Sequence, residues 1–186
     1  MASEENMASE KDKAMASEKG KPSKEGKPYG ASKCAAVIFL ALNGFLYFVI
    51  VSIAAWAVNH AIDKSHDTAS VLSLPAKIFP IYYPFGNVAT GFVVIVSLIA
   101  GIVGFTTSIT GIHNVLEWNA PNLHAAAASS LISCLLTFLA MGFACKEMDI
   151  GSTGSSKLRT LEILLILVSE TQLFCTVAIH LGVGDV

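Results

Sequence analysis

The sequence predicts an all-α fold: an integral membrane bundle of four transmembrane helices that follows a disordered N-terminal tail. Hydrophobic residues make up 53% of the 186 residues and charged residues only 14%, with a mean hydropathy of +0.61. A soluble domain carries about 25% charged residues. Residues 34–186 contain only five Lys or Arg and eight Asp or Glu. Four apolar segments in this region each reach the roughly 20 residues that a bilayer crossing requires.

The first predicted domain, residues 1–33, is a charged low-complexity tail. It repeats the sequence MASE three times and holds seven Lys and six Asp or Glu, with almost no large apolar side chain. Such a segment buries too little apolar surface to offset the entropy lost on ordering, so we expect it to be disordered. Its polarity ahead of the first apolar run argues against a secretory signal peptide.

The second predicted domain, residues 34–186, is a four-span membrane domain. Only a helix satisfies its backbone hydrogen bonds within one spanning segment, so each apolar segment is predicted to be α-helical. Pro84 and Gly86 interrupt the chain before the second helix, and Pro121 opens the third. A loop at residues 59–87 would join the first two helices. The helices are expected at about residues 34–58, 88–112, 123–145 and 161–183.

Small residues recur on one face of the second predicted helix, at spacings of four and three. They are Ser97, Gly101, Gly104, Ser108 and Gly111. The third helix carries a similar series, which is Ser129, Ser133, Thr137, Ala140 and Ala144. Small residues let helix backbones approach closely in lipid. We therefore expect these two helices to pack through the two series, and the alternatives are the lining of a narrow pore or a dimer interface.

Polar residues inside the predicted spans are candidates for function. Glu170 and Gln172 lie near the middle of the fourth helix, and Asn43 lies within the first. A carboxylate at the bilayer centre costs roughly 2.5–3.5 kcal/mol on insertion scales, so Glu170 is expected to face the bundle interior, paired or protonated. It is then a proton-coupling or substrate-facing group, a neutral structural residue, or a residue that faces a neighbouring subunit. Asn43 is expected to hydrogen-bond across helices.

A second group of charges lies where the third helix ends and the fourth begins. It consists of Lys146, Glu147, Arg159 and Glu162. Lys146 and Glu147 are expected either to extend to the membrane interface or, for Lys146, to pair with Glu162. Together with Asn43, Glu170 and Gln172 these residues form the candidate polar site. A structural role is favoured for Asn43, Lys146 and Glu147, whereas the alternatives for Glu170 stay open.

Several classes of function find no support in the sequence. It contains no nucleophile–base pair, phosphate-binding loop or metal-binding motif, so an enzyme is the least supported class and no cofactor is expected. The four cysteines Cys34, Cys134, Cys145 and Cys175 lie in or beside apolar segments and include no CxxC pair, which argues against a zinc site or a disulfide framework. No basic patch with interleaved aromatic residues predicts a nucleic-acid partner.

Several motifs resemble the plant AWPM-like family, the abscisic-acid-induced plasma-membrane polypeptides. They include GNVATGFVVIVSLIAGIVG at residues 86–104, LAMGFACKEM at residues 139–148, LRTLE at residues 158–162 and TQL at residues 171–173. The resemblance covers about residues 34–183. It implies a multi-pass protein of the plant plasma membrane that is linked to abscisic acid and to drought or cold tolerance. The polar residues it carries over by position are Asn87, Thr90, His113, Lys146, Glu147, Arg159, Glu162, Thr171, Gln172 and His180.

The sequence departs from the family pattern at two positions. Glu170 stands where the resemblance leads us to expect an apolar residue, and Leu116 stands where it leads us to expect an Arg shortly before Trp118. The first departure weakens any role of Glu170 in a mechanism common to the family.

The lysine-rich tail predicts that the N-terminus is cytosolic, and four crossings then return the C-terminus to the cytosol. Lys146, Lys157 and Arg159 conflict with this orientation, because it places the loop after the third helix outside. Two functions fit the sequence. One is a non-catalytic membrane component or complex subunit, and the other is a carrier for abscisic acid or another small amphipathic acid. The expected partners are the lipid bilayer, a homo-oligomer or larger membrane complex, and, for a carrier, a small acidic ligand.

Overall fold

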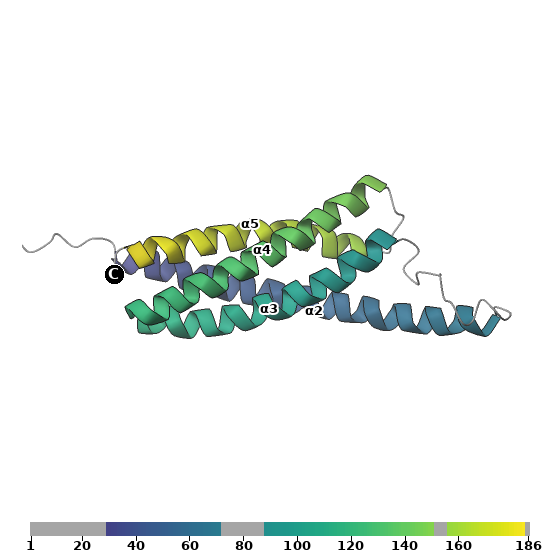
Figure 1. The fold of residues 1–186 in the computed structure, drawn as a ribbon, viewed down its shortest axis with the longest axis horizontal. Helices are drawn as coiled ribbons and strands as arrows, with labels where there is room; N and C mark the ends of the chain where they lie inside the picture. The colour runs from purple at the N-terminus through teal and green to yellow at the C-terminus, as the bar shows by residue number, and fades with distance from the viewer. Residues whose placement is uncertain (1–28, 72–87, 151–155, 185–186) are drawn as a thin grey trace, which may run out of the picture.

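Four long helices make up the computed structural model, which describes residues 29–71, 88–150 and 156–184 (Figure 1). In chain order they are α2 (Tyr29–Val71), α3 (Val88–Glu117), α4 (Ala120–Ile150) and α5 (Ser156–Gly184). All four are long and apolar enough to cross a membrane, which confirms the predicted all-α, four-span fold. Most of the predicted disordered tail lies outside the described residues, and its last five residues form the start of α2.

The helices alternate in direction and form a bundle (Figure 1). Both α2 and α4 pack against α3 and α5. The start of α2, the α3–α4 connection and the end of α5 lie at one end, which we call the turn end. At the opposite end, which we call the loop end, the end of α4 lies near the start of α3, and the start of α5 lies near Trp56 of α2.

Each helix is longer than the apolar segment that predicts it. The largest difference is in α2, which continues to Val71, so that residues 59–71, expected in a loop, are helical. This part of α2 projects beyond the other three helices (Figure 1). A helix needs apolar side chains only where it contacts lipid, and its backbone hydrogen bonds continue equally well in water. The apolar segments therefore locate the membrane-spanning part of each helix rather than its ends.

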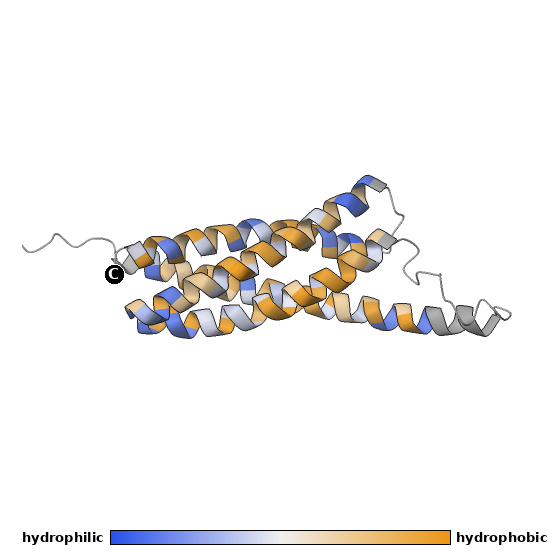
Figure 2. Ribbon diagram, viewed as in Figure 1, coloured by the Kyte–Doolittle hydropathy of each residue, from blue (hydrophilic) through white to orange (hydrophobic). Residues whose placement is uncertain are grey.

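The outer surface of the bundle is apolar and much of its interior is polar. Large hydrophobic side chains such as Phe45, Leu135 and Leu181 are more than 60% exposed. Asn43 and Gln172, by contrast, are at most 2% exposed. Hydrophobic residues cover the middle of the bundle, and hydrophilic residues are more frequent toward its ends (Figure 2). A water-soluble protein has the opposite arrangement, so the outer surface is built to contact lipid.

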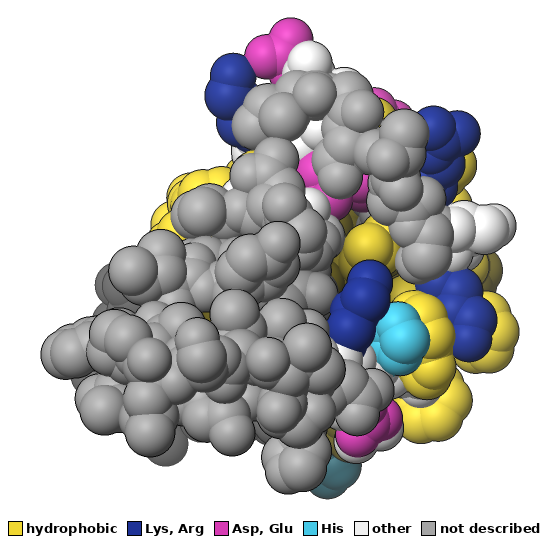
Figure 3. Space-filling model, turned by 90° about the vertical axis from the view of Figure 1, so that its right-hand side faces the viewer, with side chains coloured by type: hydrophobic (Ala, Val, Ile, Leu, Met, Phe, Trp, Pro, Cys, Tyr) yellow, Lys and Arg dark blue, Asp and Glu magenta, His cyan; other side chains and the backbone are white. Residues whose placement is uncertain are grey.

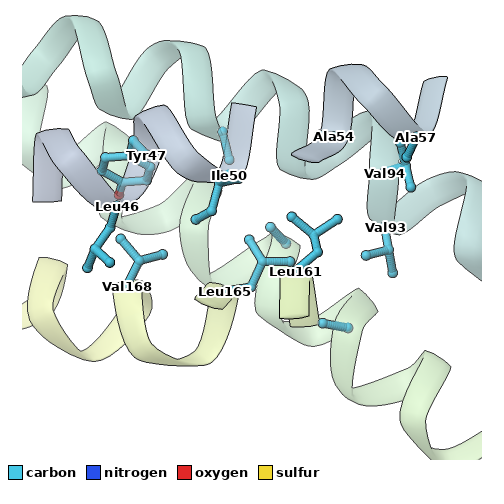
Figure 4. Close-up of a cluster of buried hydrophobic side chains, with 13 residues drawn as sticks. Leu46, Tyr47, Ile50, Ala54, Ala57, Val93, Val94, Leu161, Leu165 and Val168 are labelled. Atoms are coloured by element: carbon cyan, nitrogen blue, oxygen red, sulfur yellow. The ribbon is translucent and has the colours of Figure 1, made fainter. Parts of the chain in front are cut away.

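The buried apolar residues form two clusters, one toward each end of the bundle. The cluster toward the loop end includes Ile50, Leu161 and Leu165 (Figure 4). The cluster toward the turn end is formed by Ala36, Leu40, Val115, Leu123, Ala126, Ala127, Cys175 and Ile179. Along α2 and α5, the buried Asn43 and Gln172 lie between the two clusters. Polar groups therefore occupy the middle depth of the bundle.

The small residues of α3 face α2. A Cβ atom on Gly101 would lie 2.7 Å from a methyl group of Val51, and one on Gly111 would lie 3.0 Å from Leu40. A Cβ atom on Gly104 would overlap the ring of Tyr47. The sequence predicted that this series of small residues packs against the third helix, residues 123–145. For these three glycines the prediction is wrong, because their close neighbours lie on α2. The large side chains of α2 need the space that the glycines of α3 leave. The small residues of α4 do not need this additional space.

The α3–α4 connection is a tight turn of two residues, Trp118 and Asn119. Trp118 has a φ of 46°, which is unusual for a bulky residue. Its ring packs against Gly182, where a Cβ atom would lie 2.9 Å from the ring edge. Lys33 places its ammonium 5.8 Å from the centre of this ring and donates a 2.7 Å hydrogen bond to the carbonyl of Leu116. Residues from α2 and α5 thus hold the strained turn in place.

Candidate functional site

The first buried polar group links three helices at the middle depth. Asn43 on α2 donates a 2.9 Å hydrogen bond to the side-chain oxygen of Gln172 on α5. Gln172 in turn donates to the carbonyl oxygen of Ser130 on α4 at 3.3 Å, and Thr176 donates to the same oxygen at 3.4 Å. In lipid the alternative to these bonds is an unsatisfied polar group, so they favour the assembled bundle.

Tyr47 lies one turn further along α2 and joins the same region. Its hydroxyl is 2.7 Å from the hydroxyl of Thr137 and 3.3 Å from that of Ser133, both on α4. The ring occupies the space above Gly104 of α3. One side chain of α2 thus contacts both α3 and α4, and it fills the centre of the bundle.

A second buried polar group lies toward the loop end and contains two carboxyl groups. Thr90 on α3 donates a 2.6 Å hydrogen bond to Oε1 of Glu147 on α4. The carboxyl of Glu162 on α5 lies close to that of Glu147. Glu147 is 2% exposed and Glu162 is 8% exposed. Two carboxylates held this close together in a buried position repel each other, so the site is costly to keep with both groups ionised.

One atom of this carboxyl pair is left without a partner. Oε2 of Glu147 is buried and accepts no hydrogen bond from any described residue. A buried carboxyl oxygen without a donor is costly, and such groups are often associated with function. We therefore call Thr90, Glu147 and Glu162 the carboxyl site and treat it as the candidate functional site.

The exposed charges at the loop end surround the carboxyl site without pairing with it, and Arg159 is close enough to act electrostatically on Glu162. Lys146 pairs with Asp149 at 2.9 Å rather than with Glu162, which corrects one of the two expected arrangements. Lys157 places its ammonium 3.8 Å from the centre of the Trp56 ring, and Arg159 is exposed. Charged side chains are visible around the described part of this end (Figure 3). This placement suits the membrane interface, where long basic side chains reach water.

The predicted site residues thus do not form a single cluster. Gln172 lies with Asn43 at the middle depth, and Glu162 lies with Glu147 toward the loop end. Glu170, which was expected to face the interior, lies instead on the outer surface of α5. Within the described residues, no group of three or more His, Cys, Asp or Glu side chains is arranged to hold a metal ion.

The sequence alone did not identify Tyr47 or Thr90 as residues of a site. Tyr47 lies in a long apolar run, where its ring is easily counted as one more hydrophobic group. Its hydroxyl could have indicated a contact between helices, because a buried Tyr hydroxyl nearly always has a hydrogen-bond partner. For Thr90 the signal was weaker, since a threonine can bond to its own helix as readily as to a neighbour.

Comparisons with known proteins agree with this architecture. Residues 41–182 match the AWPM-19-like family, and this range contains all four helices except their outer ends. Membrane protein PM19L of Oryza sativa subsp. japonica is 33% identical over 153 residues, which cover 82% of this chain and 81% of the rice protein. No solved structure matches the chain. The family match and the rice relative both extend over most of the molecule, and the chain therefore belongs to the AWPM-19-like family.

Proposed function

We propose that this chain is a non-catalytic component of the plant plasma membrane that acts in the response to abscisic acid and to drought or cold. Its membership of the AWPM-19-like family and its likeness to a rice membrane protein support a membrane role in a plant. The link to the hormone, to stress and to the plasma membrane follows from the family resemblance of the motifs described above.

The observation that carries the non-catalytic part of this proposal is the filled centre of the bundle. Tyr47 occupies the space above Gly104, and its hydroxyl bonds to Thr137. Asn43 and Gln172 bond to each other across the next turn. Apart from Oδ1 of Asn43, which is buried without a hydrogen-bond partner among the described residues, these polar groups bond to one another, as expected for groups that hold helices together in lipid.

The proposal places both termini in the cytosol. The start of α2 and the end of α5 lie at the turn end, so both termini leave the bundle on the same side of the membrane (Figure 1). The lysines of residues 1–33 favour the cytosolic side for this end. Lys146, Lys157 and Arg159 would then lie at the outer face of the plasma membrane.

A second candidate function is a carrier for abscisic acid or another small amphipathic acid. The carboxyl site favours it, because the carboxyl groups of Glu147 and Glu162 lie close together in buried positions and one oxygen of Glu147 has no hydrogen-bond partner among the described residues. A carboxyl pair of this kind can take up and release one proton during a transport cycle. The carrier would need a second conformation, since Tyr47 closes the centre of the bundle in this one.

Purified protein in proteoliposomes distinguishes the two candidates. Uptake of radiolabelled abscisic acid, driven by an inward proton gradient, is measured for the unaltered chain, for Glu162→Gln and for protein-free vesicles. The non-catalytic proposal expects the same uptake in all three. Uptake by the unaltered chain that Glu162→Gln abolishes would overturn it in favour of the carrier.

As such a component, the protein is proposed to stabilise the membrane during dehydration, and a second measurement tests this role directly. Vesicles loaded with a fluorescent dye are dried and rewetted with and without the protein. The proposal expects less dye leakage from the vesicles that contain the protein. Equal leakage at every protein-to-lipid ratio would count against a membrane-stabilising role.

A further inference from the structure

Glu170 is unusual among the charged residues because it lies in the middle of a membrane-spanning helix and points outward. It is the fifteenth of the 29 residues of α5, and its side chain is exposed. At a rise of 1.5 Å per residue, about 21 Å of helix separates it from either end of α5. The carboxyl group therefore lies at the depth where hydrocarbon surrounds a bundle of this kind.

Within the described part of the bundle, the Glu170 carboxyl has no compensating partner. It makes no hydrogen bond or ion pair with any described residue. Along α5, His180 is ten residues away and Arg159 is eleven residues away on the other side, which corresponds to about 15 Å and about 16 Å of helix. Carboxyl groups inside membranes are almost always paired, because hydrocarbon offers them neither water nor donors.

The other exposed polar groups of the spans do not share this problem. Thr106 donates to the carbonyl of Ile102, and Thr110 donates to that of Thr106. Ser52 donates to the carbonyl of Phe48. Each of these hydroxyl groups bonds to its own helix and is satisfied while it faces lipid. Glu170 makes no such bond with any described residue, which leaves its carboxyl open to a partner from outside the bundle.

The surface around Glu170 is a continuous apolar stripe along α5, with the carboxyl at its centre. Spacings of three and four residues place its members on one face of the helix. Every member is exposed, and the apolar ones are large. They are Ile163, Leu167, Glu170, Phe174, Val177 and Leu181. This stripe, which we call the α5 outer stripe, is available for contact with another helix.

We propose that a second copy of this chain covers the α5 outer stripe, and that the two Glu170 carboxyl groups bond to each other in a symmetric dimer. All copies enter a membrane with the same orientation, so a two-fold axis along the membrane normal brings the same residue of each copy to the same depth. Two carboxyl groups with a proton between them satisfy each other in the absence of water. The large apolar side chains on either side of Glu170 then pack against their counterparts in the second copy.

Disulfide crosslinking tests the geometry of the dimer. In a background with Cys34→Ser and Cys145→Ser, which removes the two exposed cysteines, Val177→Cys is introduced on the α5 outer stripe. Ile102→Cys on the exposed face of α3 is the matched control. In proteoliposomes under mild oxidation, the Val177→Cys variant is expected to form a covalent dimer and the control is not. Crosslinking of the control alone, of both variants equally, or of neither would overturn the proposal.

Substitution of Glu170 tests the role of the carboxyl. Glu170→Leu keeps an apolar helix surface and is expected to weaken dimerisation in the bilayer about tenfold, whereas Glu170→Gln keeps it close to that of the unaltered chain, because amides pair reciprocally. Single-molecule photobleaching measures the dimer fraction, and circular dichroism checks the helix content of each variant. Equal dimer fractions for Glu170→Leu and the unaltered chain would overturn the proposal. So would capture of a different membrane protein by the Val177→Cys variant in plant membranes without self-crosslinking.

Discussion

At the residue scale, Tyr47 shows how one side chain sets the spacing of three helices. Its ring needs the space that Gly104 leaves on α3, and its hydroxyl reaches Thr137 on α4. A tyrosine suits the centre of a membrane bundle, because its ring provides a large apolar contact area and its hydroxyl forms directional hydrogen bonds.

Substitution of Gly104 by Ala should disturb this contact. The added methyl group would overlap the Tyr47 ring, so we expect the free energy of unfolding to fall by about 1–3 kcal/mol. The melting temperature in detergent micelles, followed by circular dichroism, measures the loss. Gly142→Ala is the matched control, because a Cβ atom at Gly142 meets nothing within 4 Å. Equal melting temperatures for the two variants would contradict the packing of Tyr47 on Gly104.

The bond between Asn43 and Gln172 should contribute a measurable coupling energy. We expect a double-mutant cycle with Asn43→Ala and Gln172→Ala to give about 0.6 kcal/mol and at most about 2 kcal/mol, because the helices separated in lipid find other partners. Unfolding by a denaturing detergent measures each variant. Strictly additive losses would mean that the two side chains do not act as a pair.

Sequence reasoning found most polar residues of the bundle but not their partners. Asn43 and Gln172 were both recognisable as polar positions in apolar spans, yet 129 residues separate them and spacing carries no information on that contact. Glu170 was expected inside because of the cost of a carboxyl in lipid. Its spacing from Ile163, Leu167 and Phe174 places it on the face with large apolar side chains, and that pattern was the better guide to its direction.

At the element scale, α3 differs from the other helices in having a glycine face toward α2 and a polar contact toward α4. The glycines bring α3 close to α2, and Thr90 connects α3 to Glu147 on α4. The small residues of both helices were visible in the sequence. The sequence did not show which helix packs closely on α3, because glycine spacing identifies a close-packing face without identifying the neighbouring helix.

Replacement of Thr90 by Val should weaken the connection between α3 and α4. The variant keeps the shape of the side chain but removes the donor to the buried carboxyl of Glu147, so we expect a loss of about 1–3 kcal/mol in the free energy of unfolding. Thermal unfolding in lipid nanodiscs provides the measurement. Thr110→Val serves as the control, since the hydroxyl of Thr110 is exposed and bonds to its own helix. An equal loss of stability in both variants would mean that the hydrogen bond from Thr90 to Glu147 does not contribute more than a bond within one helix.

At the scale of the whole molecule, the four spans followed from composition and segment length alone. Each apolar segment lies within one of the four helices, because a bilayer imposes the same length on every crossing. The ends of the helices were less predictable. The extension of α2 to Val71 lies beyond the apolar segment, where sequence hydropathy says nothing about helix formation.

The proposed orientation makes a direct prediction about accessibility. Asp149→Cys near the loop end should react with a membrane-impermeant thiol reagent in intact protoplasts, whereas Glu117→Cys at the turn end should react only after permeabilisation. Both variants carry Cys34→Ser and Cys145→Ser so that the exposed native cysteines do not contribute. The reverse labelling pattern would place the termini outside the cell.

The two-residue turn between α3 and α4 has a consequence for how the protein is made. Only residues 113–122 separate the apolar segments of α3 and α4, and most of these ten residues belong to the helix ends on either side of Trp118 and Asn119. During synthesis the two helices must therefore enter the bilayer together, as a single hairpin, after α2 has taken its position. Their orientation is then inherited from α2, and charges introduced near the hairpin should alter the topology far less than charges introduced at Lys33.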